Sequence, residues 1–170
     1  NGLAFAQKGN ITGYIDKTGK FVKQCDYFIM RESEGFAVVK RIGSEYKGYG
    51  IIDKNGNFLL PMKYDYIGGF SEGLSLVRPD FFEDRVYYID KTGKKVLEIE
   101  GNSGDFKEGL AYIRKNDKYG YIDKTGKVVI PIIYDYVSDF NDGLACVIKD
   151  DKMGYIDKNG KEVVPIIYDS

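Results

Sequence analysis

Short runs of apolar residues alternate with polar punctuation along the whole chain. Runs such as Leu144–Ile148 and Gly154–Asp157 are rich in aromatic and β-branched residues, and Gly, Asn, Asp and Pro separate them. This pattern is typical of strands and their turns. No segment carries apolar residues at helical spacing over three turns. The pattern therefore predicts an all-β protein with almost no helix.

The pattern also repeats. The segment "GYIDKTGK", Gly13–Lys20, returns in four further copies that begin at Gly50, Tyr87, Gly120 and Gly154. The second residues of successive copies are 37, 37, 33 and 34 residues apart. A Gly-Leu/Phe-Ala/Ser block occurs five times and a Pro-x-x-Tyr-Asp block three times in the same order. A fixed period of this size indicates a repeat protein.

Each repeat is predicted to hold three short strands, which in the last copy are Leu144–Ile148, Gly154–Asp157 and Lys161–Pro165. The third strand is expected to end at its proline, because proline cannot donate to a ladder. The stretch after it, "IIYDYVSDFNDG", is expected to connect to the next repeat. The predicted units are approximately 1–34, 35–72, 73–108, 109–142 and 143–170, in one array over 1–170. We expect this array to be a fragment of a longer protein.

A unit of three short strands is marginal alone, so neighbouring units must stack to bury a continuous core. The predicted fold is five tandem three-stranded β-meander repeats in a curved or superhelical solenoid. The alternative is a closed β-propeller-like ring, which usually has four strands per blade and a longer period.

The repeated Asp-Lys-Thr/Asn-Gly segment could be a cation site or a turn. Its aspartates are Asp16, Asp53, Asp90, Asp123 and Asp157. A calcium loop needs further oxygen ligands and a closing Glu, and here a Lys lies inside every copy. A turn needs only an Asp that accepts backbone N–H groups and a Gly in the left-handed conformation. We interpret the five copies as hairpin turns, with no metal.

Composition restricts the class of partner. The 25 basic and 26 acidic residues leave a net charge of −1, which argues against nucleic acid as the partner. No apolar run approaches the ~20 residues of a membrane span, so we expect no direct membrane insertion. The two cysteines, Cys25 and Cys146, are interpreted as reduced packing residues. No cofactor is expected, and these features leave the compartment open.

Catalysis has few candidate residues. The chain has no His, and it lacks a phosphate-binding loop and a nucleophile elbow. A carboxylate pair could serve a hydrolase, but the candidate carboxylates recur at repeat positions whereas a catalytic pair should be unique. These candidates are Glu34, Asp65, Glu72, Glu108, Asp135, Asp142 and Asp169. The sequence therefore predicts no enzyme.

Two connections break the repeat. The reference glycines of the first two strands are 11 residues apart in units one, four and five, as from Gly143 to Gly154. They are 15 apart in unit two, from Gly35 to Gly50, and in unit three Gly73 lies 14 residues before Tyr87. Insertions in repeat proteins often form the binding face. Phe81 and Phe82, flanked by Arg78 and Arg85, look like an aromatic anchor with a charged rim, and Tyr46 lies in the other insertion. These five residues are the predicted partner-binding site, unless the phenylalanines fold back to cover unit three.

The motif Gly-Tyr-Ile-Asp-x-x-Gly-x-x-Val-Ile-Pro-x-x-Tyr-Asp, followed by Phe-x-Asp/Glu-Gly-Leu-Ala-x-Val, is most complete at Gly120–Val147. It resembles the WG-repeat (KWG) family of bacterial β-repeat proteins. The Trp of the family motif is replaced in every copy, and Tyr87 also replaces the Gly in the third. The replacing residues are Thr12, Tyr49, Val86, Tyr119 and Met153. The resemblance implies a recognition or scaffold module without a reaction, in the cell envelope or secreted.

We therefore predict a non-catalytic module that binds a protein or glycan partner and is monomeric as this fragment. The first alternative is a passive spacer between other domains, and the second is a carboxylate-dependent hydrolase. A binding module should carry an exposed aromatic patch outside the repeat pattern. A spacer should have a surface as uniform as the repeat itself.

Overall fold

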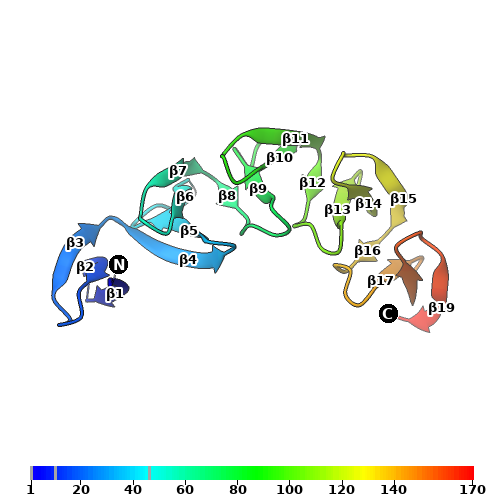
Figure 1. The fold of residues 1–170 in the computed structure, drawn as a ribbon. Helices are drawn as coiled ribbons and strands as arrows, with labels where there is room; N and C mark the ends of the chain where they lie inside the picture. The colour runs from blue at the N-terminus through cyan, green and yellow to red at the C-terminus, as the bar shows by residue number, and fades with distance from the viewer. Residues whose placement is uncertain (1, 10, 46) are drawn as a thin grey trace.

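The computed structural model describes residues 2–9, 11–45 and 47–170. These residues form five small antiparallel sheets and no helix, so none of them lies in a helix that could cross a membrane. The sheets follow one another along an open arc with the chain ends at its two extremities (Figure 1). The prediction of an all-β repeat array is confirmed.

The sheets are numbered here in chain order. Sheet 1 contains β1 (Ala4–Lys8), β2 (Ile11–Ile15) and β3 (Phe21–Cys25). Sheet 2 contains β4 (Tyr27–Ser33), β5 (Phe36–Arg41), β6 (Tyr49–Asp53) and β7 (Phe58–Tyr64). Sheet 3 contains β8 (Tyr66–Ile67), β9 (Ser75–Arg78), β10 (Arg85–Ile89) and β11 (Lys95–Glu100). Sheet 4 contains β12 (Asn102–Ser103), β13 (Leu110–Lys115), β14 (Lys118–Asp123) and β15 (Val128–Tyr134). Sheet 5 contains β16 (Tyr136–Val137), β17 (Leu144–Lys149), β18 (Lys152–Asp157) and β19 (Glu162–Asp169).

Sheets 2 to 5 each have four strands, so the prediction of three strands per unit is wrong for them. The additional strand is β4, β8, β12 or β16, and it comes from the stretch predicted to be a connection. In three of these sheets it is only two residues long, which is too short to show an alternation of polar and apolar positions. Sheets 2 to 5 therefore each begin before the glycine at which the corresponding unit was predicted to start.

The prediction that the third strand ends at its proline is also wrong. Strands β7, β15 and β19 run through Pro61, Pro131 and Pro165. Each is the last strand of its sheet, where a residue without an N–H breaks no ladder on the outer side. The pairing register with the neighbouring strand also shifts there, as at a β-bulge.

The glycine of the repeated motif lies where this last strand bends over its neighbour. A Cβ on Gly120 would lie 2.6 Å from the carbonyl oxygen of Ile130, and one on Gly154 would lie 2.7 Å from that of Val164. No side chain fits at such distances. Sheet 3 has Tyr87 at this position, and its last strand has no proline and pairs in regular register from Arg85 to Tyr88.

The buried apolar side chains form four clusters, and each cluster lies between two successive sheets. Because adjacent residues of a strand point to opposite faces, an inner sheet contributes to two clusters. In β5, Val38 packs toward sheet 3 and Val39 packs toward sheet 1. The buried side chains therefore join each sheet to the sheets before and after it in the chain, as in other repeat proteins.

An aromatic ring is wedged into three of these four junctions. The wedges are Phe70, Phe106 and Phe140, which are 1–5% exposed. Phe106 lies 4.9 Å from Tyr88 of the preceding sheet, between ring centroids. The Tyr88 hydroxyl donates to the carbonyl oxygen of Gly104 at 2.5 Å, so the same tyrosine contacts the ring and bonds the backbone that carries it.

A carboxylate also joins successive sheets at three junctions, in what we call the Glu latch. Each latch Glu accepts a hydrogen bond from a glycine N–H of the next sheet and pairs with a lysine of that sheet. The latches are Glu34–Gly73–Lys91, Glu72–Gly109–Lys124 and Glu108–Gly143–Lys158, with shortest O–N distances of 3.1, 3.0 and 3.0 Å to glycine and 3.0, 3.1 and 3.3 Å to lysine. The Lys91 ammonium lowers the pKa of Glu34.

Each latch Glu occupies a strained position. Glu34 and Gly35 have φ angles of 48° and 88°, so both central residues of this two-residue hairpin turn are left-handed, as in a type I′ turn. A residue with a Cβ is uncommon there. The bonds that the carboxylate makes to the next sheet offset this strain.

The repeated Asp segments are turns, as predicted. Asp123 Oδ1 accepts from the N–H groups of Thr125 and Lys127 at 2.9 and 3.1 Å, and Gly126 is left-handed with φ of 85°. The other four copies repeat these bonds. The Thr125 side chain contributes most to lowering the pKa of Asp123.

The turn carboxylates should make the fold sensitive to acid. The pKa values of Asp90 and Asp123 lie below the ordinary 3.8, and the leading cause for each is the hydrogen bond from its turn threonine. A carboxyl with a lowered pKa in the folded state adds stability that is present above the ordinary pKa and lost as pH falls through the folded pKa. Thermal melting should therefore shift down below pH of about 4, and less so in Asp90→Asn/Asp123→Asn. An equally steep decline in that variant would contradict the assignment.

The Glu latch should stabilise the array. We expect Glu108→Ala to lower the free energy of unfolding by about 1 kcal/mol more than Asp142→Ala. Asp142 occupies the same left-handed turn position in sheet 5, so both variants carry similar backbone strain, but its carboxylate makes no bond to a further sheet among the residues described here. Denaturant unfolding of the two variants measures the difference. Equal stabilities would show that the latch contributes nothing.

Candidate functional site

The loop between β9 and β10 carries the predicted aromatic anchor. The Phe82 side chain is 98% exposed and that of Phe81 is 51% exposed. Phe82 therefore takes no part in covering unit three, which was the alternative explanation for this pair. The two neighbouring phenylalanines thus expose apolar surface together, and exposed apolar patches often mark binding surfaces.

Charged groups hold the backbone of this loop. Asp65 is buried, and its Oδ2 accepts from the N–H of Phe81 at 2.7 Å. Asp80 accepts from the N–H of Phe82 at 2.9 Å and pairs at 2.8 Å with Lys47, which belongs to the long connection of sheet 2. This pairing lowers the pKa of Asp80 and raises that of Lys47. The two predicted insertions thus meet through an ion pair.

The two arginines of the predicted site have different surroundings. The Arg78 guanidinium lies 5.5 Å from the centroid of the Phe81 ring and donates to Asn102 of the next sheet. Arg85 pairs with Glu83 and Glu98 at 3.3 and 3.6 Å. Arg78 therefore joins the aromatic surface, whereas Arg85 belongs to a separate ion-pair group. Tyr46 lies outside the described residues.

A groove of about 360 Å³ adjoins the loop. Phe81 and Tyr112 supply aromatic walls, and Asp105 and Asp139 supply carboxylates. Burial raises the pKa of Asp105, although Arg31 Nη1 lies 3.5 Å from its carboxylate. These acids were not among the predicted site residues. The sequence did contain a signal for them, because one repeat position is not constant. It holds Arg31 and Gly69 in the earlier units and becomes acidic in the later ones, as Asp105 and Asp139.

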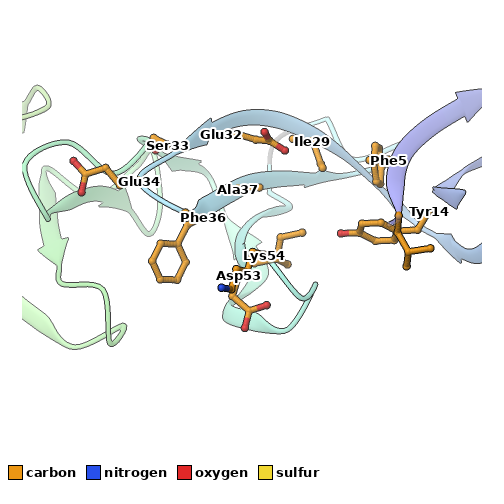
Figure 2. Close-up of a pocket in the computed structure, with 13 residues that line it drawn as sticks. Phe5, Tyr14, Ile29, Glu32, Ser33, Glu34, Phe36, Ala37, Asp53 and Lys54 are labelled. Atoms are coloured by element: carbon orange, nitrogen blue, oxygen red, sulfur yellow. The ribbon is translucent and has the colours of Figure 1, made fainter. Parts of the chain in front are cut away.

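A second hollow, of about 460 Å³, separates sheets 1 and 2. Figure 2 shows Phe5 and Tyr14 on one side of this cleft and Phe36, Asp53 and Lys54 on the other. This cleft was not among the predicted sites.

The cleft has a specific cause in the repeat. Glu32 occupies the position that holds the wedge residues Phe70, Phe106 and Phe140 in the later units. Tyr14 therefore lacks the ring that its counterpart Tyr88 contacts. The cluster between sheets 1 and 2 is accordingly the smallest among the described residues, with four buried members.

Six of the seven carboxylates considered for a hydrolase have structural contacts to other strands, turns or sheets. Glu34, Glu72 and Glu108 form the latches, and Asp65 holds the Phe81 loop. Asp135 accepts from the N–H of Asp150 at 2.8 Å and pairs with Lys118. Asp169 pairs with Lys152. Their repetition thus reflects repeated roles in joining strands, turns and sheets.

The sequence profile described as WG containing repeat matches residues 13–46, 49–78, 88–119, 119–152 and 153–170. The chain belongs to this WG repeat family. No curated protein sequence matches the chain.

Solved structures show the same kind of fold. The WG repeat chain resembles a eukaryotic initiation factor, with a TM-score of 0.59 and 14% identity over 99% of this chain and 52% of the other. It also resembles Hsv2 of Kluyveromyces lactis, with a TM-score of 0.53 and 14% identity over 96% of this chain and 62% of the other. These neighbours are β-propeller-like, and the WG repeat chain spans little more than half of their length.

The geometry accounts for the two residues that name the WG repeat. The glycine lies beneath the last strand of the sheet, as described for Gly120. The tryptophan column packs against the first strand of the next sheet, since Tyr49 lies 6.1 Å from Tyr66 and Tyr119 lies 6.4 Å from Tyr136. In sheet 1 the same column holds the buried Thr12, whose hydroxyl donates to the carbonyl oxygen of Cys25 at 2.7 Å.

The burial of the phenylalanines predicts their effect on stability. Phe82→Ala should change the free energy of unfolding by less than about 0.5 kcal/mol, because its ring makes no core contact. Phe106→Ala, the matched core change, should cost about 3–5 kcal/mol. Thermal or urea unfolding of both variants tests this difference. A large loss of stability in Phe82→Ala would place that ring in the core.

Proposed function

We propose that this chain is a non-catalytic recognition module that binds a protein partner through Phe82 and the groove beside it. The WG repeat family and the β-propeller-like fold favour an interaction or scaffold module. The observation that carries the proposal is the 98% exposure of Phe82 on a loop whose backbone is fixed by Asp65 and Asp80. An aromatic residue presented by an ordered loop loses little entropy on binding.

The surroundings of Phe82 define the chemistry of the partner. Phe82 would enter an apolar pocket of the partner, as aromatic anchors do at the centre of interfaces. The groove next to Phe81 contains Asp105 and Asp139 as well as Arg78, and Arg31 already pairs with Asp105. Asp139 is therefore the carboxylate that a lysine or arginine of the partner would complement. We favour a protein over a glycan because Phe82 projects from the surface, as an aromatic anchor that enters a pocket of a protein partner does.

The alternatives make different demands on the surface. A passive spacer needs no aromatic side chain outside the repeat, and an exposed Phe would only promote unwanted association. A carboxylate-dependent hydrolase needs carboxylates free to act on substrate, whereas six of the seven recurring carboxylates hold turns, loops and latches. These contacts support a binding role without catalysis.

The proposal predicts a partner that contacts residue 82 directly. A photo-crosslinking phenylalanine analogue at position 82, introduced in the source organism, should capture one protein that the same analogue at Ile167 does not. Ile167 is the matched control because its side chain is also apolar and 63% exposed, in sheet 5. The captured protein is then purified for binding measurements.

Affinity for the purified partner decides the proposal. Phe82→Ala should weaken binding by at least about tenfold, whereas Ile167→Ala should leave it unchanged. Equal affinities of the two variants, or crosslinks only to glycan, would overturn it. Because the melting temperature of Phe82→Ala should equal that of the parent, unfolding would not explain a loss of binding.

A further inference from the structure

We propose that the cleft between sheets 1 and 2 is a second binding site, which takes an acidic peptide segment that also carries an aromatic residue. The peptide carboxylate would bind the N–H of Gly35 and the ammonium of Lys54, and the aromatic ring would pack on Tyr14. This site is separate from Phe82, which belongs to sheet 3, so it does not depend on the function proposed above.

The three Glu latches provide the template for the carboxylate. In each latch a carboxylate lies 3.0–3.1 Å from a glycine nitrogen and 3.0–3.3 Å from a lysine ammonium. Gly35 and Lys54 occupy the same two repeat positions in sheet 2. The φ of Gly35 is 88°, and those of the three latch glycines are 84°, 88° and 79°. The backbone at Gly35 therefore has the same conformation as at the three glycines whose N–H groups bind a latch carboxylate.

Among the described residues, none places a carboxylate at the latch position of this junction. The residue that corresponds to Glu34, Glu72 and Glu108 is Asn1, which lies outside the described residues and whose neutral side chain cannot form an ion pair. Within residues 2–9, 11–45 and 47–170, no carboxylate accepts from Gly35 N–H or pairs with Lys54. A Cβ added to Gly35 would meet nothing within 4 Å, as at the three latch glycines Gly73, Gly109 and Gly143, so the surroundings of this turn match those of the occupied latches.

The missing wedge provides the place for the aromatic ring. Tyr14 lies edge-on to Phe5, with 5.4 Å between ring centroids, and both line the cleft. In the later junctions the counterparts of Tyr14 pack on Phe106 and Phe140 at 4.9 and 4.7 Å. A peptide ring could take the place of such a wedge, which Glu32 does not fill.

Charged residues of both signs line the cleft: Glu32, Glu34 and Asp53 are acidic and Lys54 is basic, and Glu34 is already paired with Lys91. Lys23 lies 5.9 Å from the Tyr14 ring centroid, and together with Lys54 and Asn55 it lines an adjoining recess of about 400 Å³. Asp53 also faces the cleft, but its oxygens accept from Asn55 and Asn57 within the turn. An equivalent Asp stands beside every occupied latch and does not prevent carboxylate binding there.

The direct test follows the amide proton of Gly35 by NMR during titration with the peptide acetyl-Phe-Ser-Glu-Gly-Leu-amide. The Gly35 amide should move downfield in a saturable way, toward the amides of Gly73, Gly109 and Gly143, which already bond carboxylates. The peptide with Gln in place of Glu should bind at least about tenfold more weakly, because it cannot form the charged pair with Lys54. Equal binding of the two peptides would overturn the proposal.

Variants of the protein give an independent test. Lys54→Gln should weaken peptide binding by about tenfold, whereas the matched Lys124→Gln, at an occupied latch, should leave it unchanged. Glu32→Phe should insert the missing wedge, raise the melting temperature and abolish binding. Equal affinities of Lys54→Gln and Lys124→Gln would also overturn the proposal, and this comparison holds even if Glu32→Phe does not fold.

Discussion

The fit of one aromatic ring between two successive sheets is the contact on which this array depends. A sheet of four short strands has two faces and cannot bury either alone. Phe106 and Phe140 reach back to the preceding sheet, where each packs against a buried tyrosine, Tyr88 or Tyr121. Where Glu32 replaces the ring, the core is smallest and a cleft remains. The packing of each junction thus follows from the residue at one position of the repeat.

The latch Glu shows how a locally unfavourable residue can be favoured by the wider fold. At the second position of a left-handed hairpin turn, Asn, Asp or Gly would suit the backbone better. The repeat nevertheless has Glu34, Glu72 and Glu108 at this position. The last unit has the shorter Asp142 there. The longer side chain reaches the glycine and lysine of the following sheet. Local strain and contact between sheets are therefore linked in one residue.

The sequence predicted the repeat and its turns well because both depend on local chemistry. Asp123 accepts hydrogen bonds within its own turn, and Gly126 supplies the left-handed backbone there. The sequence of the turn alone therefore indicates its structure. Strands of two residues, such as Tyr136–Val137, left no such pattern. The roles of Glu34 and Phe106 depend on the spacing between sheets, which no single unit reveals. The extra length of the Phe82 loop was visible, but the full exposure of Phe82 depends on how Asp65 and Asp80 fix the backbone.

The nearest-neighbour packing of the five sheets also determines how the molecule would respond to force. A pull on the two ends of the arc loads its junctions in series, so each junction bears the whole tension. The weakest gives way first, and that is the junction of Tyr14 and Glu32, which has neither an aromatic wedge nor a Glu latch among the described residues. Tension would therefore widen this cleft while the later sheets stayed closed, so the compliance of these five sheets would be concentrated at one junction.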